Sequence, residues 1–303
     1  MAAGRKLVVV ADDFGIGPGT SRAILELGQR GIVTGTVLLA NSPHAQNAID
    51  TWIAAGRPFD MGWHPCLTLD RPLADPRLVP SLVDRSGFFH PLGVFLRKIH
   101  LGRVCENEVE LEFRAQLDYY RSVVGSWPTL VNSHQHVSLF EPVGRALLRV
   151  LSEFPIRPYV RRVMEPWASL FLLPGARLKR SYLAMLGRIH SRKLNRGGYP
   201  GAPWMIGLTD PHCLQDDSFF SRWLAYAHGE TVELMCHPGH SDPTLVGRDS
   251  PPGDLRLFRR LAEFRLLGDP SFDLACKERG FERIRPGQLM ADPSASEVCA
   301  HAA

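Results

Sequence analysis

The chain has 303 residues, of which 45% are hydrophobic and 22% are charged, and its net charge at pH 7 is +4. This composition is typical of a globular protein with a sizeable core, and the charge is too small to indicate nucleic-acid binding by itself. The sequence has no run of about 18 apolar residues, so it predicts no membrane-spanning helix. Its six cysteines are widely spaced and form no CxxC pair, which favours reduced thiols and a cytoplasmic protein.

Short apolar runs alternate with amphipathic segments along the chain. Residues 6–11 are rich in valine and predict a buried strand, and residues 21–30 show the apolar spacing of a helix. The clearest helix is predicted at 106–124, where acidic residues crowd the start and Gly125 follows the end. Further strands are predicted at 32–40, 59–63, 129–132 and 231–236, and further helices at 143–154 and 254–267. This alternation predicts an α/β fold with parallel strands and helices outside them.

Polar side chains follow four of these predicted strands at their carboxyl ends. Two adjacent acids follow the first strand, and a histidine follows each of three later strands. Because the carboxyl ends of parallel strands meet at one face of an α/β sheet or barrel, where active sites assemble, we expect these side chains to converge. They are Asp12 and Asp13, His64, His134 and His237.

The adjacent acids Asp12 and Asp13 allow both a structural and a functional interpretation. Aspartate is a good N-cap, and a helix is predicted shortly after the pair. Capping needs only one aspartate, however, and two neighbouring carboxylates at a strand end repel each other, which a bound cation would relieve. The pair alone leaves both interpretations open.

Each histidine has an ordinary structural explanation when it is taken singly. His134 and His136 lie in NSHQHV, where an extended backbone would point both side chains to one face. His237 and His240 lie in HPGH, where proline and glycine predict a turn, and we expect His240 at the surface. Together with two acids at strand ends, the histidines suit one divalent ion with three protein ligands and an open position for water, as in catalytic zinc sites.

Four segments of the sequence, ADDFG, GWHPCLTL, NSHQHV and ELMCHPGH, occur in this order. With them the chain resembles the YdjC-like carbohydrate deacetylase family from about Lys6 to about Phe281. The resemblance implies a (β/α) barrel, distorted or incomplete, that holds a single divalent metal ion, zinc or magnesium. It also implies the metal ligands Asp13, His64 and His134, the general base Asp12 and the general acid His237.

The implied reaction is the hydrolysis of an amide, which removes the acetyl group from an N-acetylated sugar. A metal ion can polarise the amide carbonyl and lower the pKa of water. Asp12 would then accept a proton from the attacking water, and His237 would protonate the departing nitrogen. Three aromatic side chains could stack on a sugar ring or belong to the core: Phe14, Trp63 and Trp204.

The middle of the chain has a different composition. Residues 161–196 contain nine Lys or Arg residues and one acid, Glu165, among many apolar residues. One interpretation is a solvated helical cover of the barrel. The other is a basic, apolar surface, with its charges exposed, that approaches an anionic membrane or an amphiphilic substrate. We therefore predict one deacetylase domain at 1–290, with a basic, apolar excursion at about 161–200, and a flexible tail at 291–303.

Within the family, the segment NRGGYPGAPWMIGLTD and the basic excursion before it make the chain most similar to the hopanoid-biosynthesis-associated branch. That branch implies an N-acetylglucosamine-bearing hopanoid lipid as substrate. It is consistent with a cytoplasmic protein at the inner membrane surface that makes peripheral contact with the membrane. Whether the chain forms a homodimer is left open by the sequence.

Other functions fit some of the same residues. A deacetylase of soluble chito-oligosaccharides uses the same chemistry, and a non-catalytic sugar- or metal-binding barrel would keep the ligands. A metal-dependent phosphoesterase is less favoured, because two-metal sites need more bridging carboxylates than the sequence offers. We predict no nucleic-acid partner, because the basic segment has too many aliphatic residues for a stacking surface.

Overall fold

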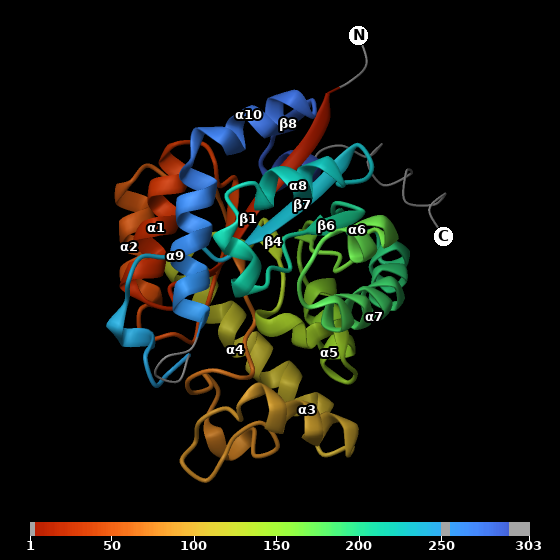
Figure 1. Ribbon diagram of the computed structural model, residues 1–303. Coiled ribbons are helices and arrows are strands. Elements are labelled where there is room, and N and C mark those ends of the chain that lie inside the picture. The colour runs from red at the N-terminus through yellow and green to blue at the C-terminus, as the bar shows by residue number, and fades with distance from the viewer. Residues whose placement is uncertain (1–3, 250–254, 291–303) are drawn as a thin grey trace.

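The computed structural model (Figure 1) describes residues 4–249 and 255–290. The predicted tail at 291–303 lies outside the described residues. In the described part of the chain the strands form one parallel sheet in the order β5-β4-β3-β2-β1-β7-β6, and β8 pairs with the start of β1. The strands are β1 (Arg5–Phe14), β2 (Gly35–Leu38), β3 (Asp60–Trp63), β4 (Leu130–Val131), β5 (Tyr159–Val160), β6 (Trp204–Ile206), β7 (Thr231–Cys236) and β8 (Phe281–Arg283).

Helices surround the sheet (Figure 1), with α1, α2 and α9 on one side and α6 and α7 on the opposite side. The helices before the middle of the chain are α1 (Pro18–Gln29), α2 (Ala45–Ala54), α3 (Leu92–His100), α4 (Glu106–Val124) and α5 (Val143–Ser152). Those after it are α6 (Trp167–Leu172), α7 (Arg177–Arg196), α8 (Phe219–Ala225), α9 (Leu255–Gly268), α10 (Pro270–Glu278) and α11 (Pro286–Met290). Four 3₁₀ turns are η1 (Pro76–Leu78), η2 (His134–Leu139), η3 (Pro211–Gln215) and η4 (Pro243–Leu245).

The sheet curves into a barrel that is incomplete between β5 and β6. No ladder joins these two strands within the described residues. Single backbone hydrogen bonds close the interval instead: the N–H of Val160 donates to the carbonyl of Pro200, and that of Met205 donates to the carbonyl of Met164, both at 2.8 Å. The predicted α/β fold, an incomplete (β/α) barrel, is confirmed.

The alternation of side chains along β1 separates the two halves of the core. Val8 and Val10 point into the barrel, where they pack with side chains from β2, β4 and β5. Val9 and Ala11 belong to the larger apolar layer between the sheet and the helices. Because side chains alternate along a strand, the next interior position after Val10 is Asp12.

Most of the predicted elements are confirmed. The bounds predicted for the helix at 106–124 and the strand at 231–236 are those of α4 and β7. The strand predicted at 32–40 is wrong in length, because β2 begins only at Gly35. The hydroxyl of Thr34 accepts a hydrogen bond from the N–H of Val9 at 3.0 Å, so a side chain occupies the position of a ladder bond there. The very short β5, β6 and β8 were not predicted, because two or three residues carry no periodic signal.

The five cysteines in the described residues are all free thiols, as predicted: Cys66, Cys105, Cys213, Cys236 and Cys276. In the same part of the chain, no helix combines the length and apolar character needed to cross a membrane.

Candidate active site

An irregularity in β1 brings both adjacent acids to the same cavity. The four residues of β1 from Ala11 to Phe14 lie opposite only three residues of β2, Thr36 to Leu38, so one residue is extra. Asp13 has a φ of 67°, the left-handed conformation that aspartate tolerates better than most residues. In a regular strand Asp12 and Asp13 would face opposite sides of the sheet, whereas here both line one cavity.

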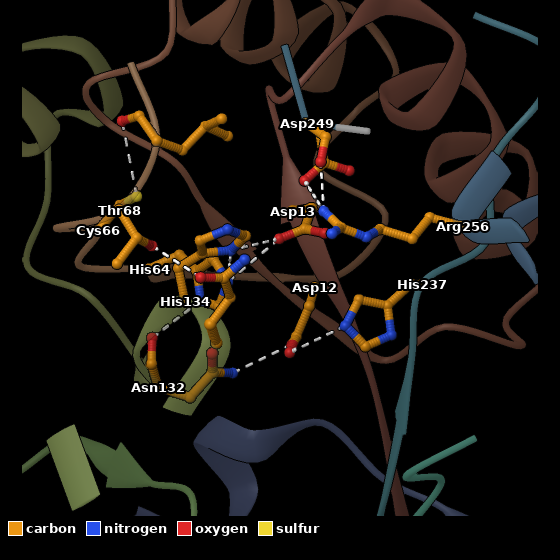
Figure 2. A network of polar contacts seen from close by, with 12 residues as sticks. Asp12, Asp13, His64, Cys66, Thr68, Asn132, His134, His237, Asp249 and Arg256 are labelled. Carbon is orange, nitrogen blue, oxygen red and sulfur yellow. Dashed lines mark hydrogen bonds and ion pairs between the residues drawn. The ribbon is translucent and has the colours of Figure 1, made fainter. Parts of the chain in front are cut away.

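Asp13, His64 and His134 lie together at the carboxyl ends of β1, β3 and β4 (Figure 2). Oδ1 of Asp13 lies 2.9 Å from Nδ1 of His134 and 3.3 Å from Nε2 of His64. The two imidazole nitrogens lie 3.3 Å apart, and all three side chains are buried. Three donor atoms of the kind that divalent metals prefer therefore form a small triangle.

This triangle fits a divalent ion. Ligands about 2.0–2.1 Å from a tetrahedral zinc ion lie about 3.3 Å from one another, which is close to the observed separations. Nδ1 of His64 donates to the carbonyl of Asn132 at 2.9 Å, so its Nε2 keeps a lone pair directed at the triangle. The residues present could thus hold one metal ion, while their roles as ligands stay a prediction.

Two residues hold Asp12 in the cavity through three hydrogen bonds. Arg161, directly after β5, donates two hydrogen bonds to its carboxylate at 2.6 and 2.8 Å, and the amide of Asn132 donates a third at 3.2 Å. Nε of Arg161 donates to Glu233 of β7, which also accepts from the hydroxyl of Tyr159 at 2.7 Å. Burial would raise the pKa of Asp12, but the Arg161 guanidinium holds that pKa well below its usual range.

A second buried arginine pairs with the other acid. Arg260 of α9 donates to Oδ2 of Asp13 at 2.6 Å and lies 3.3 Å from Asp249. The repulsion between Asp12 and Asp13 is therefore no argument for a metal, because Arg161 and Arg260 already supply one positive charge to each. The case for a metal rests on the triangle of donor atoms instead.

His237 follows β7 and faces Asp12. Its Nε2 lies 3.8 Å from Oδ2 of Asp12 (Figure 2), and its Nδ1 has no hydrogen-bond partner among the described residues. The backbone N–H of His237 donates to Glu263, whose carboxylate also accepts from the hydroxyl of Thr209 at 2.6 Å. Burial, together with the nearby Arg259, holds the pKa of His237 well below its usual value, so the imidazole is neutral.

The extended backbone predicted for His134 and His136 is wrong, so it does not explain the direction of the His136 side chain. His136 lies in η2, where Gln135 and His136 have φ values of 53° and 55°. The carboxamide oxygen of Gln135 accepts a hydrogen bond from Thr68 at 2.9 Å, which anchors this turn. His136 still reaches the cavity wall. Burial and the charge of Arg161 lower the pKa of His136 to about 3.

His240 lies outside the cavity. Its ring contacts the carboxylate of Glu26 at 3.0 Å and packs on Phe264. It is partly buried rather than fully exposed. It takes no part in the arrangement around Asp12.

The three aromatic residues considered as sugar platforms do not line the cavity. Phe14 and Trp63 are fully buried, where they pack edge-to-face on Phe59 and Phe113. Trp204 lies at the amino end of β6, away from the strand ends that carry the site. The aromatic side chains in the cavity wall are Phe140 and Tyr182.

The cavity has a volume of about 510 Å³ and three kinds of wall. Its floor carries the acids and histidines described above. An apolar wall is formed by Leu92, Leu96, Phe140, Leu183, Leu208 and Met235. A basic wall is formed by Lys179, Arg256, Arg259 and Arg260.

Four charged residues of this site were not predicted: Arg161, Glu233, Arg260 and Glu263. Glu233 gave the clearest signal, because an acid inside the apolar run TVELMC must find a buried partner. Arg161 was assigned to the basic segment because the strand before it has only two residues.

Known proteins resemble the chain over nearly its whole length. A family model described as YdjC-like protein matches residues 6–278. A carbohydrate deacetylase of Geobacillus stearothermophilus is 32% identical over 281 residues, which cover 92% of this chain and 96% of the relative. A chitooligosaccharide deacetylase of Serratia marcescens is 28% identical over 286 residues, covering 91% and 95%.

A solved structure has the same fold. A protein of Enterococcus faecalis V583 superposes with a TM-score of 0.74 at 23% identity, covering 95% of this chain and 99% of that one. The incomplete barrel is therefore shared with an experimental structure. From the match over 6–278 and the relatives at similar length, the chain belongs to the family of YdjC-like proteins.

Proposed function

We propose that this protein is a metal-dependent hydrolase that removes the acetyl group from an N-acetylated sugar, and that one domain at 1–290 carries the whole site. The observation that supports this most is the triangle of Asp13, His64 and His134 beside an ionised Asp12. The names of the relatives in Geobacillus and Serratia support the same reaction class.

The side chains suggest how a proton would travel. A bound zinc or magnesium ion supplies polarisation of the amide carbonyl and a lower pKa for water. Asp12, fixed by Arg161, accepts the proton of the attacking water. Because His237 is neutral, it must gain a proton before it can donate one to the departing nitrogen, and Asp12 at 3.8 Å is the nearest source.

We propose an N-acetylglucosamine-bearing hopanoid lipid as the substrate, on the resemblance of the segment at 195–210 and on the apolar wall beside the site. A soluble chito-oligosaccharide is the second candidate, supported by the name of the Serratia relative. The direct test supplies zinc or magnesium and measures acetate release from diacetylchitobiose and from a glycolipid with the same sugar, with phosphate release from a phosphomonoester in parallel. Phosphate without acetate would indicate a phosphoesterase, and neither product a binding protein.

Replacing His237 by alanine is expected to lower turnover while leaving the KM for substrate nearly unchanged, because its role is protonation of the leaving group. An activated acetate ester should lose less activity than the amide, since its leaving group needs little protonation. Steady-state kinetics on both substrates measure this difference. His240→Ala is the matched control, because His240 lies outside the cavity. Equal losses on ester and amide would argue against the acid role.

The exposed side chains of α6 and the start of α7 form the surface that we propose for membrane contact. Of the nine basic residues expected to be exposed, Arg161, Arg162 and Arg180 are buried, so that expectation is wrong for these three. Large apolar side chains are exposed on the same helices, with Leu178 at 90% and Phe171 at 70%. The exposed cations are Arg177 and Lys179 at the start of α7, and Arg192 and Arg196 at its end.

We expect this surface to bind vesicles that contain anionic lipid, and to release them at high salt. Each basic residue near an anionic surface contributes about 1 kcal/mol, which salt screens. Flotation with anionic and neutral vesicles at low and high salt measures the binding. The double change Phe171→Glu and Leu178→Glu should abolish it, whereas Leu274→Glu, an exposed leucine on α10, should not. Wild-type protein that floats with neither vesicle type would contradict a membrane role.

A further inference from the structure

An apolar groove of about 400 Å³ adjoins the catalytic cavity. It lies between the end of α3, the turn after η2 and one face of α7. Phe140 and Tyr182 line both the groove and the cavity, so the two adjoin at these side chains. The other residues that line the groove are Ile99, His100, Leu139, Glu141, Leu186, Ile189, His190 and Lys193.

The helical spacing of α7 explains why the groove is apolar. Leu183, Gly187 and Leu194 face the core and are buried. Tyr182, Leu186 and Ile189 follow one another at steps of four and three, so they form the neighbouring stripe. This stripe borders the groove, and Ile189 stays 51% exposed. An apolar stripe is thus left open to a ligand beside the active site.

Three polar residues that line the groove have partners within the protein. Lys193 pairs with Glu141, and Nδ1 of His100 hydrogen-bonds the carbonyl of Leu96 at 2.7 Å. The cavity therefore presents the acids and histidines, and the groove beside it presents the apolar stripe of α7.

We propose that this groove binds the hydrocarbon part of an amphiphilic substrate whose acetamido sugar lies beside Asp12 and His237. The proposal rests on the proposed function for the position of the sugar. The shared border at Phe140 and Tyr182 supports this occupant, because a hydrocarbon attached to a sugar in the cavity would reach the groove past these two side chains. Transfer of the hydrocarbon from water to apolar walls would favour binding.

The test replaces Ile189 by aspartate. This side chain is half exposed, so the change places a charge in the groove without burying it in the core. The matched control is Met185→Asp on the same helix, since Met185 is equally exposed at 50% and does not line the groove. Circular dichroism and the melting temperature verify that both variants fold.

The probes are dodecyl N-acetylglucosaminide and the soluble sugar diacetylchitobiose. Ile189→Asp is expected to raise the KM for the dodecyl glycoside by about tenfold or more and to leave the KM for diacetylchitobiose unchanged. Met185→Asp should change neither value. Equal effects of Ile189→Asp on both substrates, or no effect on the dodecyl glycoside, would overturn the proposal.

A binding measurement separates this proposal from the proposed reaction. Dodecyl glucoside has the hydrocarbon but no amide, so its binding by calorimetry reports the groove whether or not the protein hydrolyses amides. Wild type and Met185→Asp should bind it, and Ile189→Asp should bind it about tenfold more weakly. Absence of acetate release from any substrate would contradict the deacetylase function alone, whereas equal binding by all three proteins would contradict the groove alone.

Discussion

Asp12→Asn is expected to lower turnover by about two to four orders of magnitude, the usual effect of removing a general acid or base. The substitution keeps the size of the side chain and removes the basic lone pair that would accept the proton of water. Arg161 keeps its partner Glu233, so the buried guanidinium is not left without a counter-charge. Steady-state acetate release measures the loss, and elemental analysis measures the metal content of the same sample.

The metal content decides between the possible results. The variant should keep its metal, because Asp12 is outside the triangle of Asp13, His64 and His134. Activity close to wild type would show that Asp12 is structural and that the base lies elsewhere. Loss of the metal would show that the two roles must be exchanged, with Asp12 as the metal ligand and Asp13 as the general base.

His64→Ala and His134→Ala are each expected to reduce metal occupancy sharply, because each removes one of three ligands. Elemental analysis after dialysis against a fixed free-metal concentration measures occupancy, and circular dichroism checks that the variants fold. The matched control is His136→Ala, which changes a histidine of the same NSHQHV segment that also lines the cavity but lies outside the triangle. It should keep wild-type metal content.

Occupancy equal to wild type in one histidine variant would remove that residue from the ligand set. An equal loss in all three would show that η2 has been distorted rather than a ligand removed.

The position of the site was predictable because it depends on chain topology. Asp12, His64 and His237 each follow an apolar run long enough to predict a strand, and His134 follows the shorter strand predicted at 129–132. Parallel strands place such residues at one end of the sheet. The helix α4 was predictable to the residue, because its acidic start and Gly125, with a φ of 79°, are local signals.

The electrostatic partners were not predictable from local pattern. Arg161 and Arg260 lie 149 and 247 residues from the acids that they pair with. Nothing in a run of surface-like charges indicates which arginine is buried. The same limit affected the aromatic residues: Trp63 follows the pattern of a strand, and only the packing of Phe113 against it shows that it belongs to the core.

The extra residue in β1 has a consequence for how this chain can change. Side chains along a strand point alternately to its two faces, and the extra residue between Ala11 and Phe14 shifts this alternation by one position. Deletion of either Asp12 or Asp13 would restore regular alternation, but it would leave the site with one carboxylate, and a regular strand that kept both would send one of them into the apolar layer beneath the helices. The number of residues between Ala11 and Phe14 therefore matters to the site as much as the identity of its acids. A sequence alignment that allows gaps within ADDFG would overlook a change in this number.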